Sequence, residues 1–501
     1  MNIMMLLEMA NSAFADRTAF INSDDSSSIT YQELYERSGQ AAYNALTSAS
    51  EYFAIRDVNS LAMPIGLFAS AWAGLPFVPL NYRLTHLEID SLLARVTPAY
   101  LVTEDNHKVN FEHREDIVPV SRSAFLAGTG TELADPWAMD PEDIAVLLFT
   151  SGTTGEPKAA VLRQKHVVSY ILGSVEFASA SEEEAALVCV PPYHVAGISA
   201  VLSSVYAGRR VVQLPNFSAE AWLNVGRSER ITSAFVVPTM LARIVDALEG
   251  EDSAHMPHLT SLSYGGGKMH RSVLERAMEL FPETDFTNAY GLTETSSTIS
   301  VLGPEEHRAA FTSKDPQQHH RLVSAGFPLP GVEIEIRDTA GNVLQPYEHG
   351  EIYVRGEQVS GEYRGLGSRI DAQGWFPTRD CGYTDAEGYI FLEGRADDVI
   401  VRGGENLSPG EIEDVILDHE AVADAAVVGI PDAQWGEAIA AAIVLKRGKQ
   451  ASPDELKTWV NDRLRSSRVP QVIHFTDELP YNPTGKLLRT EIRSELIDME
   501  T

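Results

Sequence analysis

The stretch Phe149–Ala159 reads FTSGTTGEPKA and follows an apolar run, Ile144 to Phe149, that predicts a buried β-strand. Its glycines, Gly152 and Gly155, permit tight turns whose backbone N–H groups point inward. The remaining donors are hydroxyl groups and one lysine: Thr150, Ser151, Thr153, Thr154 and Lys158. This combination predicts a phosphate cradle, although the G-x-x-x-x-G-K-[ST] pattern of a P-loop is missing. The alternative interpretation is a surface loop.

Working outward from this loop, short apolar runs alternate with helical ones. The order is typical of βαβ units in a parallel sheet, where functional residues gather at the carboxyl ends of the strands. The predicted strands are Ile144 to Phe149, Ala186 to Val190, Arg210 to Leu214, Thr232 to Val237, Leu259 to Tyr264 and Asp285 to Asn288.

From about Gly331 the pattern changes to alternating apolar and polar residues in GVEIEIRD, GEIYVRG and GYIFLEG. These segments predict antiparallel strands in a small sheet or barrel. After Gly394 an α+β unit of about a hundred residues is expected, within the usual size of a domain. Its elements are a helix near Glu411 to Leu417, strands at Ala425 to Val428 and Ile439 to Leu445, and a helix capped at Ser452.

Composition excludes several classes of protein. A chain of 501 residues is expected to form at least two domains. Its net charge of −32 repels nucleic acids and anionic membranes, so we expect neither as a partner. The two cysteines, Cys189 and Cys381, indicate neither a disulfide scaffold nor a cysteine metal site, and they fit a reducing cytoplasm.

Two apolar segments could be mistaken for targeting or membrane segments. Met1 to Ala15 ends in an A-x-A pattern, but Glu8 interrupts it and no Lys or Arg precedes Arg17, so secretion is not expected. Leu61 to Leu80 holds twenty uncharged residues, enough to span a bilayer. The glycine and prolines at positions 74 to 79 break it, which predicts a buried helix followed by a core strand.

Further motifs occur along the chain in a fixed order. They are PPYHVAG at 191–197, NAYGLTET at 288–295, GEIYVRG at 350–356, TRD at 378–380, GRADDVIVRGGENLSPGEIE at 394–413 and PYNPTGKLLR at 480–489. Together with TSGTTGEPK, they resemble the signatures of the adenylate-forming superfamily: acyl-CoA synthetases, nonribosomal-peptide adenylation domains and firefly luciferase. The resemblance covers essentially the whole chain, and the acyl- and aryl-CoA ligase branch is the most similar.

The resemblance implies an α/β fold with two domains. Residues 1–394 would form doubly wound α/β subdomains with a small β-barrel-like subdomain, in a monomer or homodimer. Residues 395–501 would form a small mobile α+β domain with its hinge at Asp397. The implied reaction joins a carboxylic acid to ATP as an acyl-adenylate, then transfers the acyl group to CoA.

The resemblance also implies roles for individual residues. The loop from Thr150 to Lys158 would hold the β- and γ-phosphates of ATP, Glu294 would hold Mg²⁺, and Thr293 would touch the α-phosphate. Asp380, which we expect at a turn, and Arg395 would bind the ribose. The adenine would lie against Tyr290 and its neighbours, namely Gly265, Gly266, Gly267, Asn288, Ala289 and Gly291. Taken singly, Glu294 and Asp380 would be ordinary helix and turn carboxylates.

Lys486 is implied to be the catalytic lysine of adenylation, and His194 to gate the acid pocket. Without the motifs, Lys486 would be a solvated loop lysine and His194 a structural histidine. Gly403, Gly404 and Trp435 are implied to line the CoA tunnel. Departures from the family pattern are Ala159, where a glycine is usual, and Tyr52 to Leu61, which lacks the usual G-D-R-V-A-like wording.

The acid itself stays open at this point. The expected pocket wall is mostly small or apolar, which disfavours an acid with a charged side chain and leaves fatty and aryl acids. Its residues are Val195, Gly197, Ser199, Val237, Thr239, Met240, Gly267, Ala289 and Thr295. Two alternatives also stay open: an enzyme that loads a carrier-protein thiol, and a non-catalytic binding or scaffold protein that has kept the fold.

Overall fold

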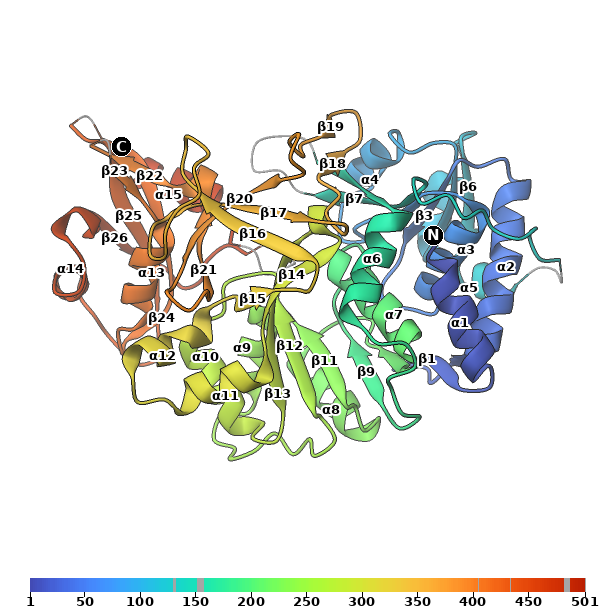
Figure 1. Cartoon of the computed structure of the whole chain (residues 1–501), viewed down its shortest axis with the longest axis horizontal. Helices are drawn as coiled ribbons and strands as arrows, with labels where there is room; N and C mark the ends of the chain where they lie inside the picture. Colours follow the sequence, from blue (N-terminus) through green and yellow to red (C-terminus); the bar gives the residue numbers. More distant parts are fainter. Residues whose placement is uncertain (129–131, 151–156, 404, 433, 482–486, 501) are drawn as a thin grey trace.

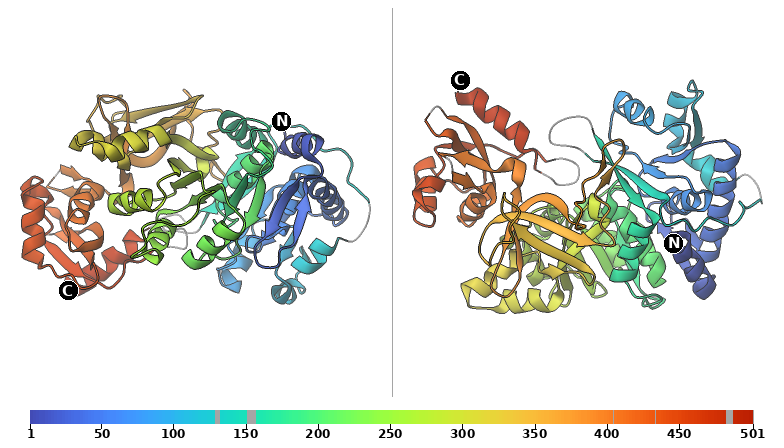
Figure 2. Two further views of the ribbon diagram at one scale, coloured as in Figure 1. Left: turned by 90° about the horizontal axis from the view of Figure 1, so that it is seen from below. Right: turned by 45° about the horizontal axis from the view of Figure 1, so that its top comes forward.

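The computed structural model describes residues 1–128, 132–150, 157–403, 405–432, 434–481 and 487–500. Figure 1 shows the N-terminal helices at one end of the molecule and the C-terminal part at the opposite end, with the strands of the large sheets between them. Both views in Figure 2 keep the C-terminal part at this end.

A nine-stranded sheet forms the centre of the large domain, and its six middle strands pair in parallel. In spatial order they are β13 (Asp285–Leu292), β12 (Ser261–Gly265), β11 (Ser233–Val236), β9 (Ala185–Val188), β10 (Arg210–Gln213) and β1 (Thr18–Asn22). The strands expected between residues 186 and 288 are therefore confirmed. Antiparallel strands complete the edges: β2 (Ser28–Thr30), β14 (Ser297–Leu302) and β15 (Phe327–Pro328).

The strand before the opening loop, β7 (Ile144–Thr150), belongs to a second sheet of eight strands, not to the series that follows it. It pairs in parallel with β4 (Phe77–Pro79) and antiparallel with β8 (Lys158–Arg163), so the two strands that flank the opening loop are neighbours in this sheet. The remaining strands are β3 (Tyr52–Arg56), β5 (Ala99–Thr103), β6 (Ile117–Ser121), β18 (Glu362–Tyr363) and β19 (Gly367–Ser368).

Helices between these two sheets share one apolar core with both of them. They are α1 (Met4–Phe14), α2 (Tyr31–Thr47), α3 (Ala62–Ala73), α6 (Gln164–Ser174) and α7 (Val195–Ala207), with α5 (Arg122–Ala127) at the margin. The expectation for Leu61 to Leu80 is confirmed: α3 is buried and leads into β4 in the core. Among the described residues, no helix combines the length and the apolar character needed to cross a membrane.

The outer faces of the two sheets carry separate cores. The core on the nine-stranded sheet is formed by helices α8 (Ala219–Ser228), α9 (Pro238–Ala247), α10 (Arg271–Leu280) and α11 (Pro304–Thr312). The core on the eight-stranded sheet is formed by α4 (His86–Leu93) and the 3-10 helix η1 (Asp105–Phe111). Helices on both faces of a largely parallel sheet are the doubly wound arrangement expected from the pattern. Short connecting helices are α12 (Pro316–His320), η2 (Thr293–Thr295) and η3 (Arg321–Val323).

A third sheet of four antiparallel strands follows, and it is open rather than a barrel. Its order is β16 (Val332–Arg337), β17 (Gly350–Gly356), β20 (Phe376–Thr384) and β21 (Ile390–Arg395). The first and last strands lie at opposite edges, so the barrel-like closure expected from the sequence is wrong. The strand β20 was not expected, because Pro377, Asp380 and Gly382 interrupt its apolar alternation.

The small C-terminal domain is a five-stranded sheet with helices on both faces. Its strands are β22 (Ile400–Arg402), β23 (Glu405–Leu407), β24 (Val422–Asp432), β25 (Gly436–Leu445) and β26 (Val472–Phe475). Its helices are α13 (Pro409–Leu417), α14 (Pro453–Asn461) and α15 (Arg489–Glu500), with η4 (Ala396–Asp398) and η5 (Ser466–Arg468). The expected cap of α14 is confirmed, since the Ser452 hydroxyl accepts a hydrogen bond from the Glu455 N–H at 3.2 Å.

Candidate active site

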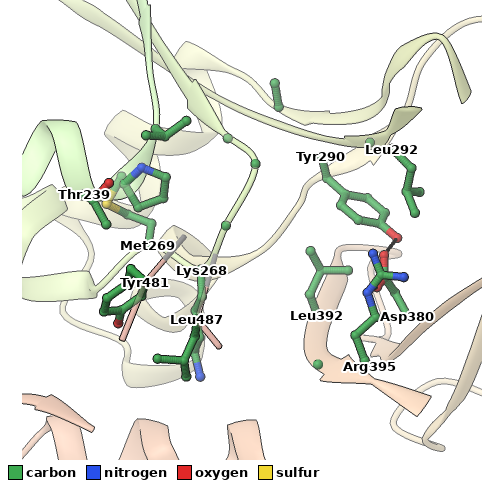
Figure 3. Close-up of a pocket in the computed structure, with 18 of the residues that line it drawn as sticks. Thr239, Lys268, Met269, Tyr290, Leu292, Asp380, Leu392, Arg395, Tyr481 and Leu487 are labelled. Atoms are coloured by element: carbon green, nitrogen blue, oxygen red, sulfur yellow. Dashed lines mark hydrogen bonds and ion pairs between the residues drawn. The ribbon is translucent and has the colours of Figure 1, made fainter. Parts of the chain in front are cut away.

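A cleft of about 2370 Å³ lies where the ends of β7, β12 and β13 face the third sheet and the small domain. Single ligands usually occupy pockets of about 300–1,000 Å³, so this cleft has room for more than one molecule. Figure 3 shows two groups of lining side chains: Tyr290, Asp380 and Arg395 on one side, and Lys268, Tyr481 and Leu487 on the other.

Tyr290, Asp380 and Arg395 form one hydrogen-bonded group (Figure 3). The Tyr290 hydroxyl donates to an Asp380 carboxylate oxygen at 2.7 Å, and Arg395 Nε lies 2.8 Å from the other oxygen. Burial and the Asp380 charge raise the pKa of Tyr290 well above its usual range, so this phenol stays a hydrogen-bond donor at neutral pH. The three residues that the resemblance assigns to the nucleotide therefore lie together, and their role in binding it stays a prediction.

The backbone around Asp380 differs from the expected turn. Asp380 lies inside β20, where it pairs with Arg395 of β21, and it belongs to a bulged stretch of β20 opposite β17, since Pro377 pairs with Tyr353 but Cys381 pairs with Glu351. The preceding residue, Arg379, has a φ of 65°, which is uncommon for a residue with a side chain. A bulge of this kind redirects a side chain out of the regular alternation, here into the cleft.

Three glycines at the end of β12 form a bare ledge in the cleft. A Cβ atom at Gly265 would lie 2.1 Å from the Ala289 carbonyl oxygen on β13. Gly266 has a φ of 82°, a conformation that side chains rarely adopt. Gly267, Ala289 and the neighbouring Asn288 and Gly291 line the same cleft. The ledge leaves room for a flat group against exposed backbone.

Thr150 and Lys158 place the two ends of the opening loop in the cleft. They face one another in the β7–β8 ladder, and the Thr150 hydroxyl donates to the Lys158 carbonyl oxygen at 3.3 Å. Several predicted site residues lie outside the described residues: Ser151, Gly152, Thr153, Thr154, Gly155, Gly404 and Lys486.

Tyr363 links this loop to Glu294 and was missed by the sequence reasoning. Its hydroxyl donates to a Glu294 carboxylate oxygen, and Lys158 Nζ lies 5.9 Å from its ring centroid. Burial and the Glu294 charge raise the pKa of Tyr363 above its usual range. Tyr363 comes from the two-residue strand β18 in GEYRGLG, a stretch without periodicity or motif, so no sequence signal marked it.

Glu294 is held in place by backbone contacts. It lies with Thr293 in the 3-10 helix η2, and its carbonyl oxygen accepts from the N–H groups of Ser360 at 2.8 Å and Gly361 at 3.1 Å. Within the described ranges, no group of three or more His, Cys, Asp or Glu side chains could hold a metal ion. Mg²⁺ is commonly held by one or two carboxylates plus substrate phosphates, so a single carboxylate in the cleft, such as that of Glu294, fits that ion.

His194 precedes α7 and lines the cleft. Its Nε2 atom is buried and has no hydrogen-bond partner in the described part of the chain. Burial, assisted by the Arg83 charge, lowers the pKa of His194 to about 4. The imidazole is therefore neutral at pH 7, and one polar ring atom is unsatisfied beside the cleft.

The acid-pocket prediction divides into two groups. Val195, Val237, Thr239 and Met240 line the cleft. Gly197, Ser199 and Thr295 are not among the described residues that line the cleft, so their place in the acid pocket stays a prediction. The Thr295 hydroxyl donates to the carbonyl oxygens of Leu292 and Ser297, and Gly197 packs on the Pro191 carbonyl.

The small domain brings the residues that flank Lys486 to the cleft. Tyr481 and Leu487 both line it, and they pair with each other through a β-bridge (Figure 3). Asp397 also lines the cleft and forms an ion pair with Arg379. Gly403 and Trp435 contact each other, with a 2.8 Å hydrogen bond between the Gly403 N–H and the Trp435 carbonyl, but neither lines the cleft.

The two departures from the family pattern lie away from the cleft. Ala159 is buried in β8 and its φ is not positive, so its methyl group is accommodated. In the other departure, the Asp57 carboxylate accepts from the Ser60 hydroxyl at 2.7 Å and pairs with Arg122 at 2.9 Å. Burial raises the pKa of Asp57 to about 6.

Comparison with known proteins agrees with this geometry. Residues 7–364 match the model of the AMP-binding enzyme family, and residues 411–486 match that of the AMP-binding enzyme C-terminal domain. A fatty acid–[acyl-carrier-protein] ligase from Streptomyces coeruleorubidus is 33% identical over 489 residues, covering 93% of this chain and 91% of that protein. A 2-succinylbenzoate–CoA ligase from a Geobacillus species is 32% identical over 478 residues, covering 93% and 92%.

Solved structures of the Bacillus subtilis o-succinylbenzoate CoA synthetase have the same fold. One is in complex with its acyl-adenylate intermediate and has a TM-score of 0.84, 30% identity and coverage of 97% of both chains. Another holds ATP and a magnesium ion and has a TM-score of 0.83, with 97% and 98% coverage. The chain belongs to the AMP-binding enzyme family of adenylate-forming ligases.

Proposed function

We propose that this protein is an ATP-dependent acyl-CoA synthetase. It joins a carboxylate to ATP with release of pyrophosphate, then transfers the acyl group from the acyl-adenylate to CoA with release of AMP. One observation carries the proposal. A single cleft unites the Tyr290–Asp380–Arg395 group, the Thr150 and Lys158 ends of the loop, and the residues flanking Lys486.

The nucleotide subsite follows from these contacts. The Gly265–Gly267 ledge accepts the adenine against bare backbone, beside the Tyr290 ring. Asp380 accepts hydrogen bonds from the ribose hydroxyls, since a carboxylate has acceptor sites beyond those used by Tyr290 and Arg395. Arg395 keeps this carboxylate charged and oriented.

The phosphate subsite neutralises the charge of the leaving pyrophosphate. Thr150 and Lys158 hold the β- and γ-phosphates together with the loop between them. Glu294, oriented by Tyr363, would hold Mg²⁺, and the ion would supply positive charge that offsets the phosphate charge. Lys486 binds oxygens around the reacting phosphate as negative charge moves to pyrophosphate.

The acid enters past His194. Because burial keeps this imidazole neutral, it offers the carboxylate a hydrogen bond rather than a fixed charge. Val195, Val237 and Met240 then form an apolar wall, which accepts a fatty or aryl acid and leaves a charged side chain without a partner. Of the relatives named above, one is named for a fatty acid, and the other for 2-succinylbenzoate, an aryl acid that carries a second carboxylate.

The two domains carry different parts of the proposed site. The large domain, residues 1–394, carries the nucleotide and acid subsites, and residues 395–501 carry Lys486, with the hinge at Asp397. The strand β21 ends at Arg395, one residue past this boundary. Rotation about Asp397 would carry Lys486 out of the cleft and bring Gly403, Gly404 and Trp435 toward the CoA thiol.

A carrier-protein thiol is the second candidate acceptor. It is favoured by the 33% identity to a fatty acid–[acyl-carrier-protein] ligase. Both acceptors end in a thiol, so the acyl-adenylate chemistry is the same in either case. We place the protein in the cytoplasm, since Cys189 and Cys381 are both free and burial raises the pKa of each thiol to about 12.

One mass-spectrometric assay tests these proposals. Purified protein is incubated with Mg·ATP and a pool of fatty, aryl and dicarboxylic acids, with CoA, with a phosphopantetheinylated carrier protein, or with neither. We expect AMP and one acyl-CoA, which also identifies the acid. An acyl-carrier product without acyl-CoA would select the second candidate. ATP binding without any product would contradict both.

A further inference from the structure

Three polar contacts between side chains join the large and small domains beside the cleft. The large-domain side is the segment Lys268–Arg271, which connects β12 to α10. The small-domain side is formed by α13 and the beginning of β24. Figure 3 shows Lys268 and Met269 of this segment on the same side of the cleft as Tyr481 and Leu487. Tyr481 also contacts the small-domain side directly, through Asp424. The contacts therefore lie next to the chain that carries the residues flanking Lys486.

Two of the three contacts are direct ion pairs. Lys268 Nζ lies 2.6 Å from an Asp414 carboxylate oxygen and donates to the Gly410 carbonyl oxygen at 3.1 Å. Arg271 donates to an Asp418 carboxylate oxygen at 2.6 Å. All four charged side chains are 34–49% exposed, so each pair alone contributes little to stability. Their importance lies in the relative orientation of the domains.

The third contact is more buried and has three members. His270 Nε2 lies 3.5 Å from one Asp424 oxygen, and the Tyr481 hydroxyl donates to the other at 2.9 Å. The His270 and Asp424 side chains are 25% and 22% exposed. Asp424 is thus the acceptor shared by the large domain and by Tyr481, the residue directly before positions 482–486.

We propose that Lys268, His270 and Arg271 form a latch with Asp414, Asp424 and Asp418 that holds the small domain in the orientation for adenylation. The proposal rests on the two-step reaction proposed above. Three basic side chains of the large domain each face a carboxylate of the small domain. The latch therefore pairs opposite charges, and all three pairs form together only in this one orientation of the domains. Rotation of the small domain must break all three contacts, and they set the balance between the two half reactions.

Arg271 and Asp418 offer the sharpest test, because neither lines the cleft in the described part of the chain. The variants are Arg271→Asp, Asp418→Arg and the double variant that exchanges the two charges. The first half reaction is measured as pyrophosphate exchange into ATP, with an equimolar pool of decanoic, ferulic and 2-succinylbenzoic acids. The second is measured as thioester formation from a synthetic acyl-adenylate of whichever acid gives exchange.

We expect each single variant to lose about five- to tenfold in exchange rate, with thioester formation from the supplied adenylate unchanged or faster. The double variant should recover most of the exchange rate. A matched control is Glu142→Gln, which removes an ion pair of similar exposure, Lys165–Glu142 at 2.7 Å, inside the large domain. Equal loss in both half reactions, or no recovery in the double variant, would overturn the latch.

A second measurement does not depend on any acid. Spin labels are attached at Glu283→Cys on the large domain and Asp462→Cys on the small domain, both exposed, in a Cys381→Ser background. The remaining Cys189 is buried. Pulsed electron paramagnetic resonance should give one narrow distance with the latch intact and a broad distribution in Arg271→Asp. Identical distributions would contradict the latch, whereas absent exchange in the unmutated protein would contradict the proposed reaction only.

Discussion

At the scale of single residues, Asp380 connects the phenol of Tyr290 and the guanidinium of Arg395 at the proposed ribose subsite. Replacing it as Asp380→Asn removes the charge on which both contacts depend. A hydrogen bond to a charged group is worth about 1.5–3 kcal/mol, or about 10- to 100-fold in affinity. We expect the KM for ATP in pyrophosphate exchange to rise by this factor.

The control for Asp380→Asn is Asp116→Asn, which removes an exposed partner of Arg114, and neither of these two residues lines the cleft. Its KM for ATP should stay at the value of the unmutated protein. An unchanged KM in Asp380→Asn would remove Asp380 from the ribose subsite.

The lowered pKa of His194 leads us to expect a specific pH dependence of the free energy of unfolding. Its pKa is about 4 in the folded protein and about 6.5 in an unfolded chain. Between these values the unfolded chain binds more protons, so the free energy of unfolding falls as the pH falls from about 6.5 to 4. His194→Gln removes this contribution, so the variant should lose less stability than the unmutated protein between pH 7.5 and 5.

His166 and His307 also have pKa values lowered to about 4 by burial, and they contribute equally to both proteins in this comparison. Urea unfolding at the two pH values measures the difference. Parallel pH curves for the variant and the unmutated protein would show that His194 is not protected from protons in the fold.

At the scale of elements, the close approach of β12 and β13 depends on Gly265. In Gly265→Ala the new methyl group meets the Ala289 carbonyl at 2.1 Å, so the strands must separate. Overpacking of this kind costs about 1–3 kcal/mol. We expect a lower melting temperature together with weaker ATP binding, measured by thermal shift with and without ATP.

The matched control is Gly173→Ala in α6, where a Cβ atom would meet nothing within 4 Å. That change should raise stability slightly, by about 0.5–1 kcal/mol, because alanine favours a helix. Equal ATP-dependent shifts in both variants would mean that the β12 ledge does not carry the base.

The sequence could predict elements whose signal is local. The strands from β9 to β13 are apolar runs bounded by turn residues, and Ser452 with Pro453 marks the start of α14. Which strands share a sheet depends on tertiary contacts. Local sequence patterns therefore could not predict that β7 pairs with β4, or that the sheet from β16 to β21 is open. The motifs brought Tyr290, Asp380 and Arg395 together, whereas Tyr363 reaches Glu294 only through the folded β18.

At the scale of the whole molecule, the small domain has cores of its own. Among the described residues, its two buried apolar clusters are formed only from Ile400 onward and share no core with the large domain. A chain of residues 1–398 keeps Arg395 and the complete third sheet. It should fold and bind ATP within about tenfold of the full protein, measured by calorimetry.

Without the small domain, pyrophosphate exchange by residues 1–398 should fall by at least about a hundredfold, since Lys486 is gone. Full exchange activity in the shortened chain would show that Lys486 is dispensable. A folded chain that no longer binds ATP would place part of the nucleotide subsite on the small domain.

The exposed indole of Trp435 has an optical consequence. Its side chain is 46% exposed on the outer surface of the small domain, whereas the other tryptophans, at positions 72, 137, 222, 375 and 459, are buried or half-buried. A small collisional quencher such as acrylamide will therefore reach Trp435 more readily than any of these. If domain rotation brings this indole against CoA, the quenchable part of the fluorescence will shrink on adding CoA, and the second half reaction can be followed in native protein by light alone.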